Sequence, residues 1–246
     1  MIVGLQIGKE KSIGCPGKNY MKILGRQLNE YSLMAAYNCK HVDKLYISTD
    51  SPAIKSTASV YNATVIDRPS ELATPESLTE DVLIHAYEFI VKDLGETPEM
   101  IVLLFANTPM TDCNKLTEAI EILREDNTLD SCFSVVQYNM FSPTRARKLE
   151  NNIVDSFVDL NVFDDVSSIR DSQGDVYFAD LSIQVLRSCC FEDIENGKLP
   201  FKWMGNKTYG LEVDFGFDID AEWQIAVAEY WLKKHGFSET STPYLD

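Results

Sequence analysis

The chain has 246 residues, of which 45% are hydrophobic and 24% are charged, a composition typical of a globular protein with one large or two small domains. Its formal net charge is -16 at pH 7, so most of its surface repels a nucleic-acid backbone or an anionic membrane. An anionic ligand therefore has to be met by local positive charge. We expect neither nucleic acid nor a membrane among its partners.

Cysteine usage and hydropathy bear on the cellular compartment. No CxxC pair occurs among the six cysteines, and the adjacent Cys189 and Cys190 cannot readily bridge each other, which argues against a zinc site and a disulfide framework. The chain shows no charged-then-apolar leader and no apolar run long enough to span a bilayer. These features predict reduced thiols and a cytoplasmic location.

Strand-length apolar runs alternate with stretches of helical spacing, which is the pattern of a βαβ sheet. The chain opens with a predicted strand over Ile2–Ile7 and a loop rich in glycine and lysine over Gly8–Asn19, followed by a helix around Asn29–Cys39. The next predicted elements are strands over Lys44–Asp50 and Thr64–Ile66, a helix over Asp81–Val91, a strand over Met100–Ala106, a helix over Lys115–Leu123 and a strand over Ser131–Tyr138. The apolar character of these strands favours a buried, parallel sheet.

The regular pattern stops after Tyr138. Polar residues accumulate over residues 139–172 and the periodicity fades, so this segment is predicted to be an inserted arm or a substrate lid. The remaining predicted elements are a regular stretch over Asp175–Asp180, a helical segment over Leu181–Cys189, a strand-like stretch over Gly210–Asp220 and a last helix over Ala221–Lys234. A single three-layer α/β domain over residues 1–246, with a mostly parallel sheet and one excursion, is the simplest account.

The loop GKEKSIGCPGKN over Gly8–Asn19 is the first candidate for chemistry. In an open α/β sheet, ligands bind beyond the carboxyl ends of the strands, and this loop follows the first strand. Gly14 and Gly17 leave backbone N–H groups open to an anion, while Lys9, Lys11 and Lys18 add positive charge. The loop matches neither the P-loop pattern nor GxGxxG. Composition alone therefore leaves a triphosphate loop and a solvated turn as equal alternatives.

Several short blocks carry a family resemblance. GCPGKN resembles the signature G-(I/L)-P-x-K-N of the acylneuraminate cytidylyltransferase family, and RPSELA over Arg68–Ala73 resembles its R-P-x-E-L-A. ISTDSPAI, LLFANTPM, QGDVYF and FDIDAEWQIAVAE resemble further family blocks, in the family's order and over nearly the whole chain. Family members make CMP-sialic acid and related CMP-activated nonulosonic acids. The resemblance implies a Rossmann-like nucleotidyltransferase fold and CTP-dependent cytidylyl transfer to a sugar acid, with release of pyrophosphate.

The resemblance also implies site residues, position by position. Lys18, which we expect to be catalytic, and Asn19 would contact the triphosphate and the nucleoside, while Arg68 and the main chain near Ala73 would read cytosine. The other positions expected to bind the nucleotide are Lys9, Ser12, Gly14, Gly17, Asn107 and Thr108.

The DID motif over Asp218–Asp220 matches the two metal-binding aspartates of the family, and it has an independent physical basis. Residues two apart on a strand point the same way, so both carboxylates would face one spot, as Mg²⁺ bound to a triphosphate requires. We therefore expect Asp218 and Asp220 to be catalytic metal ligands and Mg²⁺ to be the cofactor. The alternative is that Asp220 caps the last helix, and the two roles are compatible.

An acidic acceptor needs a cation, and the inserted segment supplies several. The residues expected to bind the acceptor are Arg145, Arg147, Lys148, Arg170 and Gln173. In the family this segment reaches across to a partner subunit, so the resemblance implies a homodimer. Apolar side chains such as Phe141 and Ile153 in this polar stretch suit that role, and packing against the chain's own domain is the alternative.

Two departures from the family pattern leave alternatives open. Ile13 stands where the family has lysine, and Phe105 stands where it has glutamine. A catalytically idle relative that binds CTP is one alternative, although the retention of Asp218 and Asp220 favours an enzyme. The other is an enzyme that activates a different acid, such as a 3-deoxy-octulosonate-like sugar or a phosphonate.

Overall fold

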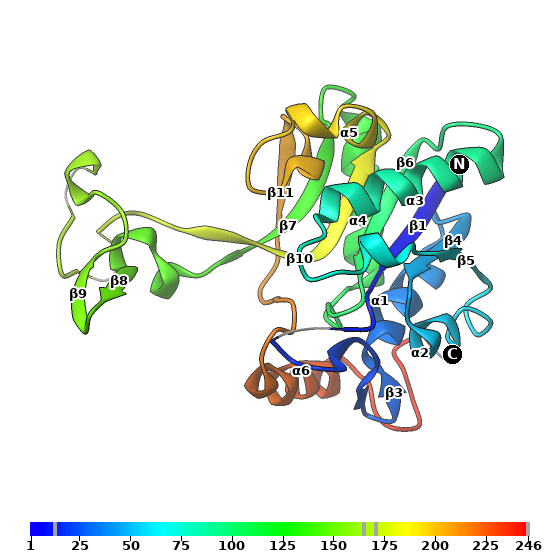
Figure 1. Ribbon diagram of the computed structural model, residues 1–246, viewed down its shortest axis with the longest axis horizontal. Helices are drawn as coiled ribbons and strands as arrows, with labels where there is room; N and C mark the ends of the chain where they lie inside the picture. Colours follow the sequence, from blue (N-terminus) through cyan, green and yellow to red (C-terminus); the bar gives the residue numbers. More distant parts are fainter. Residues whose placement is uncertain (12–13, 164–165, 170–171, 245–246) are drawn as a thin grey trace.

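The computed structural model describes residues 1–11, 14–163, 166–169 and 172–244. Its centre is a seven-stranded sheet with the order β11-β7-β10-β6-β1-β4-β5 (Figure 1). The strands are β1 Ile2–Ile7, β4 Lys44–Thr49, β5 Ala63–Asp67, β6 Met100–Phe105, β7 Ser131–Gln137, β10 Tyr177–Arg187 and β11 Thr208–Glu212. Only β10 is antiparallel to its neighbours, β6 and β7. The predicted α/β class with a mostly parallel sheet is confirmed.

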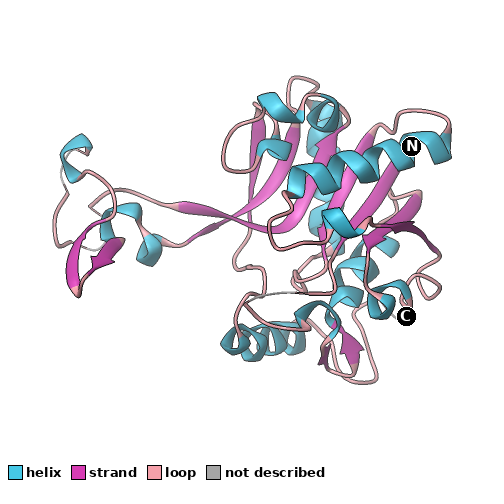
Figure 2. Cartoon of the chain, in the orientation of Figure 1, coloured by secondary structure: helices cyan, strands magenta, loops and turns pink. Residues whose placement is uncertain are grey.

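Helices cover both faces of this sheet (Figure 2). They are α1 Leu28–Tyr37, α2 Pro52–Lys55, α3 Thr79–Leu94, α4 Cys113–Glu125, α5 Cys189–Glu192 and α6 Glu222–Lys234. Residues of α1, α4 and α6 belong to one hydrophobic core, and residues of α3 and α5 belong to the other. Within β6, Val102 and Leu104 enter the first core whereas Ile101 and Leu103 enter the second, because side chains alternate along a strand. The result is a three-layer domain.

Short elements complete the chain. Beside the main sheet lies a small hairpin of β2 Lys22–Ile23 and β3 Arg26–Gln27. The 3-10 turns outside the inserted segment are η1 Lys18–Tyr20, η2 Ser70–Leu72, η6 Ile194–Asn196 and η7 Lys202–Met204. All six cysteines are free thiols. Within the described ranges, no helix combines the length and the apolar character that a membrane span requires.

The helix predicted over Leu181–Cys189 is wrong: residues 181–187 form most of strand β10, and Cys189 begins α5. It pairs with both β6 and β7, and its side chains from Ser182 to Leu186 are all buried. A strand covered on both faces shows no alternation of polar and apolar residues, so its run of apolar residues also fits the spacing of a helix. Pairing within the sheet, which is a tertiary interaction, overrides the local preference.

Between β7 and β10 the chain leaves the sheet as an arm, defined here as the described residues between 139 and 176 (Figure 1). Its elements are η3 Asn139–Phe141, η4 Pro143–Arg145, η5 Leu160–Val162 and the hairpin of β8 Arg147–Glu150 with β9 Ile153–Ser156. The sequence predicts an insertion over residues 139–172, which lie within this stretch. At the root of the arm, Tyr177 of β10 pairs with Gln137 of β7.

Candidate active site

Loops that follow the carboxyl ends of the parallel strands β1, β5 and β6 meet at one edge of the sheet, as expected for an open α/β fold. They surround a cavity of about 220 Å³, together with residues of α3 and of the segment before α6. The described residues that line it are Ile7, Gly8, Lys9, Lys18, Asn19, Arg68, Leu72, Ser77, Thr79, Val82, Phe105, Asn107, Asp218 and Asp220. The N-terminal loop and the C-terminal aspartates thus meet in one place.

The local fold of its loop holds Lys18 in the cavity wall. Gly17 has φ 74°, in the left-handed region that glycine tolerates, and it starts the turn η1. The backbone N–H of Lys18 donates to the carbonyl of Cys15 at 3.1 Å. Lys18 is 9% exposed, and its ammonium forms a salt bridge with the carboxylate of Asp220. A cation that is almost withdrawn from water therefore faces the acidic pair.

The prediction that Asp218 and Asp220 lie on a strand is wrong. Strand β11 ends at Glu212, and the segment from there to α6 is a loop that is tied to the end of β6. The N–H of Ile219 donates to the carbonyl of Asn107 at 2.9 Å. In return, the side-chain amide of Asn107 donates to Asp218 Oδ2 at 3.2 Å and to the carbonyl of Ile219 at 3.1 Å. These reciprocal hydrogen bonds fix Asp218 at the cavity.

Asp218 is perturbed by its surroundings. Burial raises the pKa of Asp218 above its ordinary value, the charge of Asp220 raises it further, and the ammonium of Lys18 opposes the rise. The site therefore favours additional positive charge. Asp220 does not cap the last helix: the N-cap is Ala221, and the side chain of Gln224 accepts the backbone N–H groups of Asp220 and Ala221, both at 2.7 Å.

Lys9 and Asn19 fasten the N-terminal loop. The side-chain amide of Asn19 donates to the carbonyl of Lys9 at 2.8 Å, and the ammonium of Lys9 donates to the carbonyl of Thr74 at 3.2 Å. Gly14 packs against the aspartate segment, since a Cβ atom there would lie 2.8 Å from the carbonyl oxygen of Asp220. The loop and the segment thus contact each other through backbone as well as side chains. Ser12 lies outside the described residues.

Arg68 is 8% exposed and lines the cavity. Its guanidinium donates from Nη2 to the carbonyl of Ser48 at 2.7 Å. Burial lowers the pKa of Arg68 to about 10, and the negative charge of Asp50 acts in the opposite direction. Arg68 therefore stays charged at neutral pH, and it supplies a second buried cation beside Lys18.

Some residues expected to bind the nucleotide support the cavity without lining it. Thr108 is 1% exposed, and its hydroxyl donates to the carbonyl of Phe105 at 2.9 Å, so it stabilises the turn that carries Asn107. Ala73 ends the turn η2, where its N–H donates to the carbonyl of Ser70 at 3.1 Å. Neither belongs to the described cavity wall.

The described residues expected to bind the acceptor belong to the arm, and none of them lines this cavity. Arg145 and Arg147 line a separate hollow of about 530 Å³ within the arm. Lys148 is exposed on β8, and Gln173 contacts Thr144, 3.5 Å between side-chain oxygens. Arg170 lies outside the described residues. Within one chain, therefore, the described arm residues of this set do not share the cavity of Lys18 and Asp218.

Sequence reasoning missed the apolar side of the cavity. The apolar side chains that line it are those of Ile7, Leu72, Val82 and Phe105. Among these, the sequence marks only Phe105, as a departure from the family pattern. Thr79 and Val82 reach the cavity because the first turn of α3 docks beside it. No local motif announces such a contact, since it depends on how a helix packs on the sheet.

Comparison with known families now bears on this geometry. The family described as cytidylyltransferase matches residues 10–178, which is more than half of the chain. The chain belongs to this family. The match includes the N-terminal loop from Glu10 onward, Arg68 and Asn107, whereas Asp218 and Asp220 lie beyond it.

Named cytidylyltransferases support the same assignment. N-acylneuraminate cytidylyltransferase of Escherichia coli O18:K1:H7 is 27% identical over 160 residues, which cover 65% of this chain and 37% of that protein. N-acylneuraminate cytidylyltransferase A of Danio rerio is 26% identical over 250 residues, which cover 98% of this chain and 53% of that protein. CMP-N,N'-diacetyllegionaminic acid synthase of Legionella pneumophila is 27% identical over 171 residues, which cover 67% of this chain and 71% of that protein. The resemblance to acylneuraminate cytidylyltransferases is confirmed, although the chain spans about half or less of the first two relatives.

Solved structures of cytidylyltransferases share the fold. CMP:2-keto-3-deoxy-manno-octonic acid synthetase, solved in complex with CTP, superimposes with a TM-score of 0.67 at 14% identity, over 95% of this chain and 98% of that one. A 4-diphosphocytidyl-2C-methyl-D-erythritol synthase from Anaerococcus prevotii superimposes with a TM-score of 0.57 at 15% identity, over 94% of this chain and 96% of that one. The predicted Rossmann-like nucleotidyltransferase fold is therefore confirmed.

Proposed function

We propose that this protein is a CTP-dependent cytidylyltransferase that activates a sugar acid of the sialic or other nonulosonic type. The observation that carries the proposal is the meeting of Lys18 with Asp218 and Asp220 at one cavity, beside the buried Arg68. Cations for a triphosphate and oxygen ligands for a metal are thus available together. The names of the relatives, which include sialic and legionaminic acid enzymes, support the choice of acceptor class.

The donor set of the cavity fits Mg²⁺. Carboxylate oxygens are the ligands that this hard cation prefers. Burial and the charge of Asp220 raise the pKa of Asp218, and a cation bound between the two carboxylates would oppose this rise. The described residues contain no group of three or more histidine, cysteine, aspartate or glutamate side chains able to hold a metal. Asp218 and Asp220 would therefore hold the ion together with phosphate oxygens and water. When bound, Mg²⁺ neutralises charge on the transferring phosphate.

The residues of the chain would act mainly by positioning and charge neutralisation. Lys18 and Lys9 would contact the triphosphate, Asn19 would hold the nucleoside, and Arg68 would bind at the base. An oxygen of the acceptor attacks the α-phosphate of CTP in line, so the new oxygen–phosphorus bond forms as the bond to pyrophosphate breaks. The proton of the acceptor oxygen passes to solvent, and no side chain needs to become a covalent nucleophile.

A homodimer would bring the arm of one subunit to the cavity of another. Exposed apolar residues gather on the arm, a distribution typical of an interface. They are Met140, Phe141, Leu149, Ile153, Val154, Phe157, Val162, Phe163 and Ile169. Arg145 and Arg147 of one arm would then face the acidic acceptor in the site of the partner, since they lie apart from the cavity of their own chain. Free thiols and the use of CTP are in keeping with a cytoplasmic enzyme.

Pyrophosphate release with CTP, Mg²⁺ and a panel of sugar acids tests this proposal. We expect release with at least one acid, dependent on Mg²⁺ and reduced by orders of magnitude in Asp220→Ala, because a lost metal ligand removes stabilisation from the transferring phosphate. Asp193→Ala, which changes an exposed aspartate after α5, serves as the matched control. Tight CTP binding without turnover across the panel would instead favour a CTP-binding relative without catalysis, as Phe105 in the cavity allows.

A further inference from the structure

The segment that carries the two aspartates is contacted by two side chains at Gly216, two residues before Asp218. The hydroxyl of Tyr138 donates to the carbonyl of Gly216 at 3.0 Å. A Cβ atom at Gly216 would also lie 1.9 Å from Oδ2 and 2.7 Å from Cγ of Asp180. Gly216 does not have a positive φ, so close approach, not backbone strain, is what requires a glycine.

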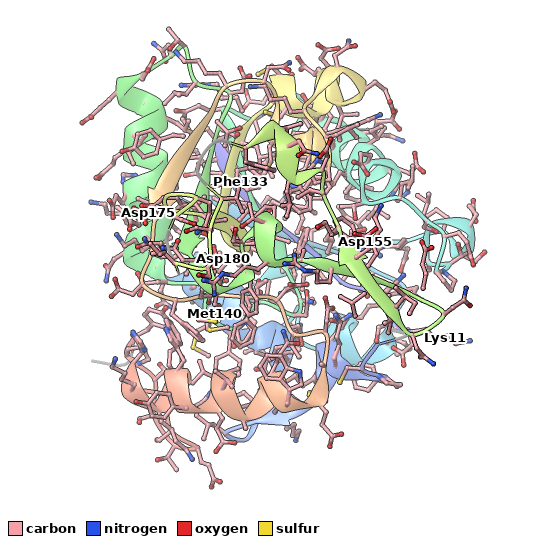
Figure 3. All side chains as sticks on the ribbon, turned by 90° about the vertical axis from the view of Figure 1, so that its left-hand side faces the viewer. Lys11, Phe133, Met140, Asp155, Asp175 and Asp180 are labelled. Atoms are coloured by element: carbon pink, nitrogen blue, oxygen red, sulfur yellow. The ribbon has the colours of Figure 1, made fainter. Side chains whose placement is uncertain are left out.

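Asp180 belongs to β10 and is 4% exposed, and it lies near the middle of the molecule in the view of Figure 3. The hydroxyl of Ser182 donates to its Oδ2 atom, while Oδ1 has no hydrogen-bond partner among the described residues. Burial raises the pKa of Asp180 above its ordinary value. A carboxyl group that is buried with one unpartnered oxygen costs stability. Its Oδ2 and Cγ atoms occupy the space beside the backbone of Gly216, a contact that a smaller side chain would lose.

Tyr138 links this contact to the arm. It follows β7 directly, at the root of the arm. Its ring lies 5.8 Å from Phe141 and 6.4 Å from Phe178 between centroids, and 6.3 Å from Phe215 of the aspartate segment. The ring is thus held by packing on several sides, so its hydroxyl reaches Gly216 from a fixed position.

We propose that Tyr138 and Asp180 are positioning residues that clamp Gly216 and thereby keep Asp218 and Asp220 opposite Lys18. The inference rests on the proposed function for its catalytic consequence, but its structural core concerns the aspartate pair alone. Asn107 holds the segment at Ile219, on the C-terminal side of Asp218, and the clamp holds it at Gly216, on the N-terminal side. Without the clamp, the pair binds a divalent ion less well, although the fold persists.

Mn²⁺ binding in the presence of CTP, followed by the electron paramagnetic resonance signal of free Mn²⁺, tests the clamp without requiring turnover. Tyr138→Phe removes only the hydroxyl and keeps the aromatic packing. Since one hydrogen bond is worth about 1 kcal/mol, we expect Mn²⁺ affinity to fall about fivefold and kcat to fall similarly, with KM for CTP within about twofold. Tyr87→Phe is the matched control, because the Tyr87 hydroxyl donates to Glu192 at 2.7 Å between α3 and α5. It should lower Tm comparably and leave Mn²⁺ affinity unchanged.

Substitutions of Asp180 separate shape from mere stability. Asp180→Asn keeps the volume beside Gly216 and should bind Mn²⁺ as the wild type does, whereas Asp180→Ala leaves a gap and should weaken binding about fivefold or more. Gly216→Ala should be more damaging still. Adding Asp180→Ala to it should restore part of the affinity, because the two clashing atoms are gone and the remaining Asp180 Cβ lies at 3.2 Å.

The outcomes are distinguishable. Tyr138→Phe and Asp180→Ala variants that lose only Tm, in step with the Tyr87→Phe control, while Mn²⁺ affinity stays at the wild-type value, would overturn the clamp. A wild-type protein that binds Mn²⁺ with CTP but turns over no acid would contradict the proposed function, and the variant series would still decide the clamp. Absence of Mn²⁺ binding with CTP in the wild type would refute both.

Discussion

Replacing Lys18 by methionine removes an ammonium from the cavity while keeping most of the side-chain volume. The Lys18 side chain is 11% exposed and that of Asp220 is 65% exposed, so the pair lies between protein interior and water. One charge pair at about 4 Å is worth about 4 kcal/mol at an effective dielectric constant of about 20, and the exposure of Asp220 reduces this to about 2 kcal/mol. Because a triphosphate carries several charges, we expect a loss of about 2 to 4 kcal/mol, which lowers kcat/KM about 30- to 1000-fold.

The assay is continuous pyrophosphate release at saturating acceptor and Mg²⁺, with CTP varied. Lys55→Met is the matched control, because its ammonium pairs at the surface with Asp67 at 2.6 Å, and its kcat/KM should stay within about twofold of the wild type. Tm should be recorded for both variants, so that lost folding is not read as lost catalysis. A folded Lys18→Met protein with kcat/KM within about threefold of the wild type would refute the electrostatic reasoning for the cavity.

Three further predictions follow from buried or exposed groups. Arg68→Met removes a buried guanidinium from the cavity wall, so KM for CTP should rise about 10- to 100-fold with a smaller change in kcat. A KM for CTP equal to that of the wild type would exclude Arg68 from nucleotide binding. Burial raises the pKa of Asp180, so the folded state favours the protonated carboxyl group. The stability of the wild type therefore falls as the pH rises from the ordinary carboxyl pKa toward the raised pKa of Asp180. Asp180→Asn should therefore be the more stable protein at pH 7 in urea unfolding, with the difference narrowing toward pH 4; a difference independent of pH would contradict the burial argument. Ile153→Ser with Val154→Ser, at positions 70% and 62% exposed, should convert a dimer into a folded monomer in light scattering, and a monomeric wild type would contradict the proposed interface.

The sequence predicted the elements whose signals are local. The helices around residues 29–39, 81–91 and 115–123 were recognised from apolar spacing and are confirmed as α1, α3 and α4. Strand β10 was not recognised, because burial on both faces removes the alternation by which a strand is read. Its pairing partners, β6 and β7, precede it by many residues, so the information that makes it a strand is not local.

Several residues of the predicted site line the cavity, but the sequence does not show how the fold holds them there. Asp218 and Asp220 were placed on a strand, whereas reciprocal hydrogen bonds with Asn107 hold them in a loop. Thr108 is buried, and its hydroxyl stabilises the chain after β6, while its expected contact with the nucleotide stays a prediction. A motif identifies which side chains occur together in the sequence, but hydrogen-bond partners that are far away decide where each one points.

The sequence by itself determined the α/β class, the acidic surface with its few local cations, and the motifs that carry the family resemblance, since each depends on residue type and short-range spacing. Only the tertiary structure decided that Lys18 reaches Asp220, that Arg145 and Arg147 lie apart from that cavity, and that Asp180 lies beside Gly216. The physical reason is that sheet order and loop packing bring distant segments into contact, and contact energies of this kind have no signature within a short window of sequence.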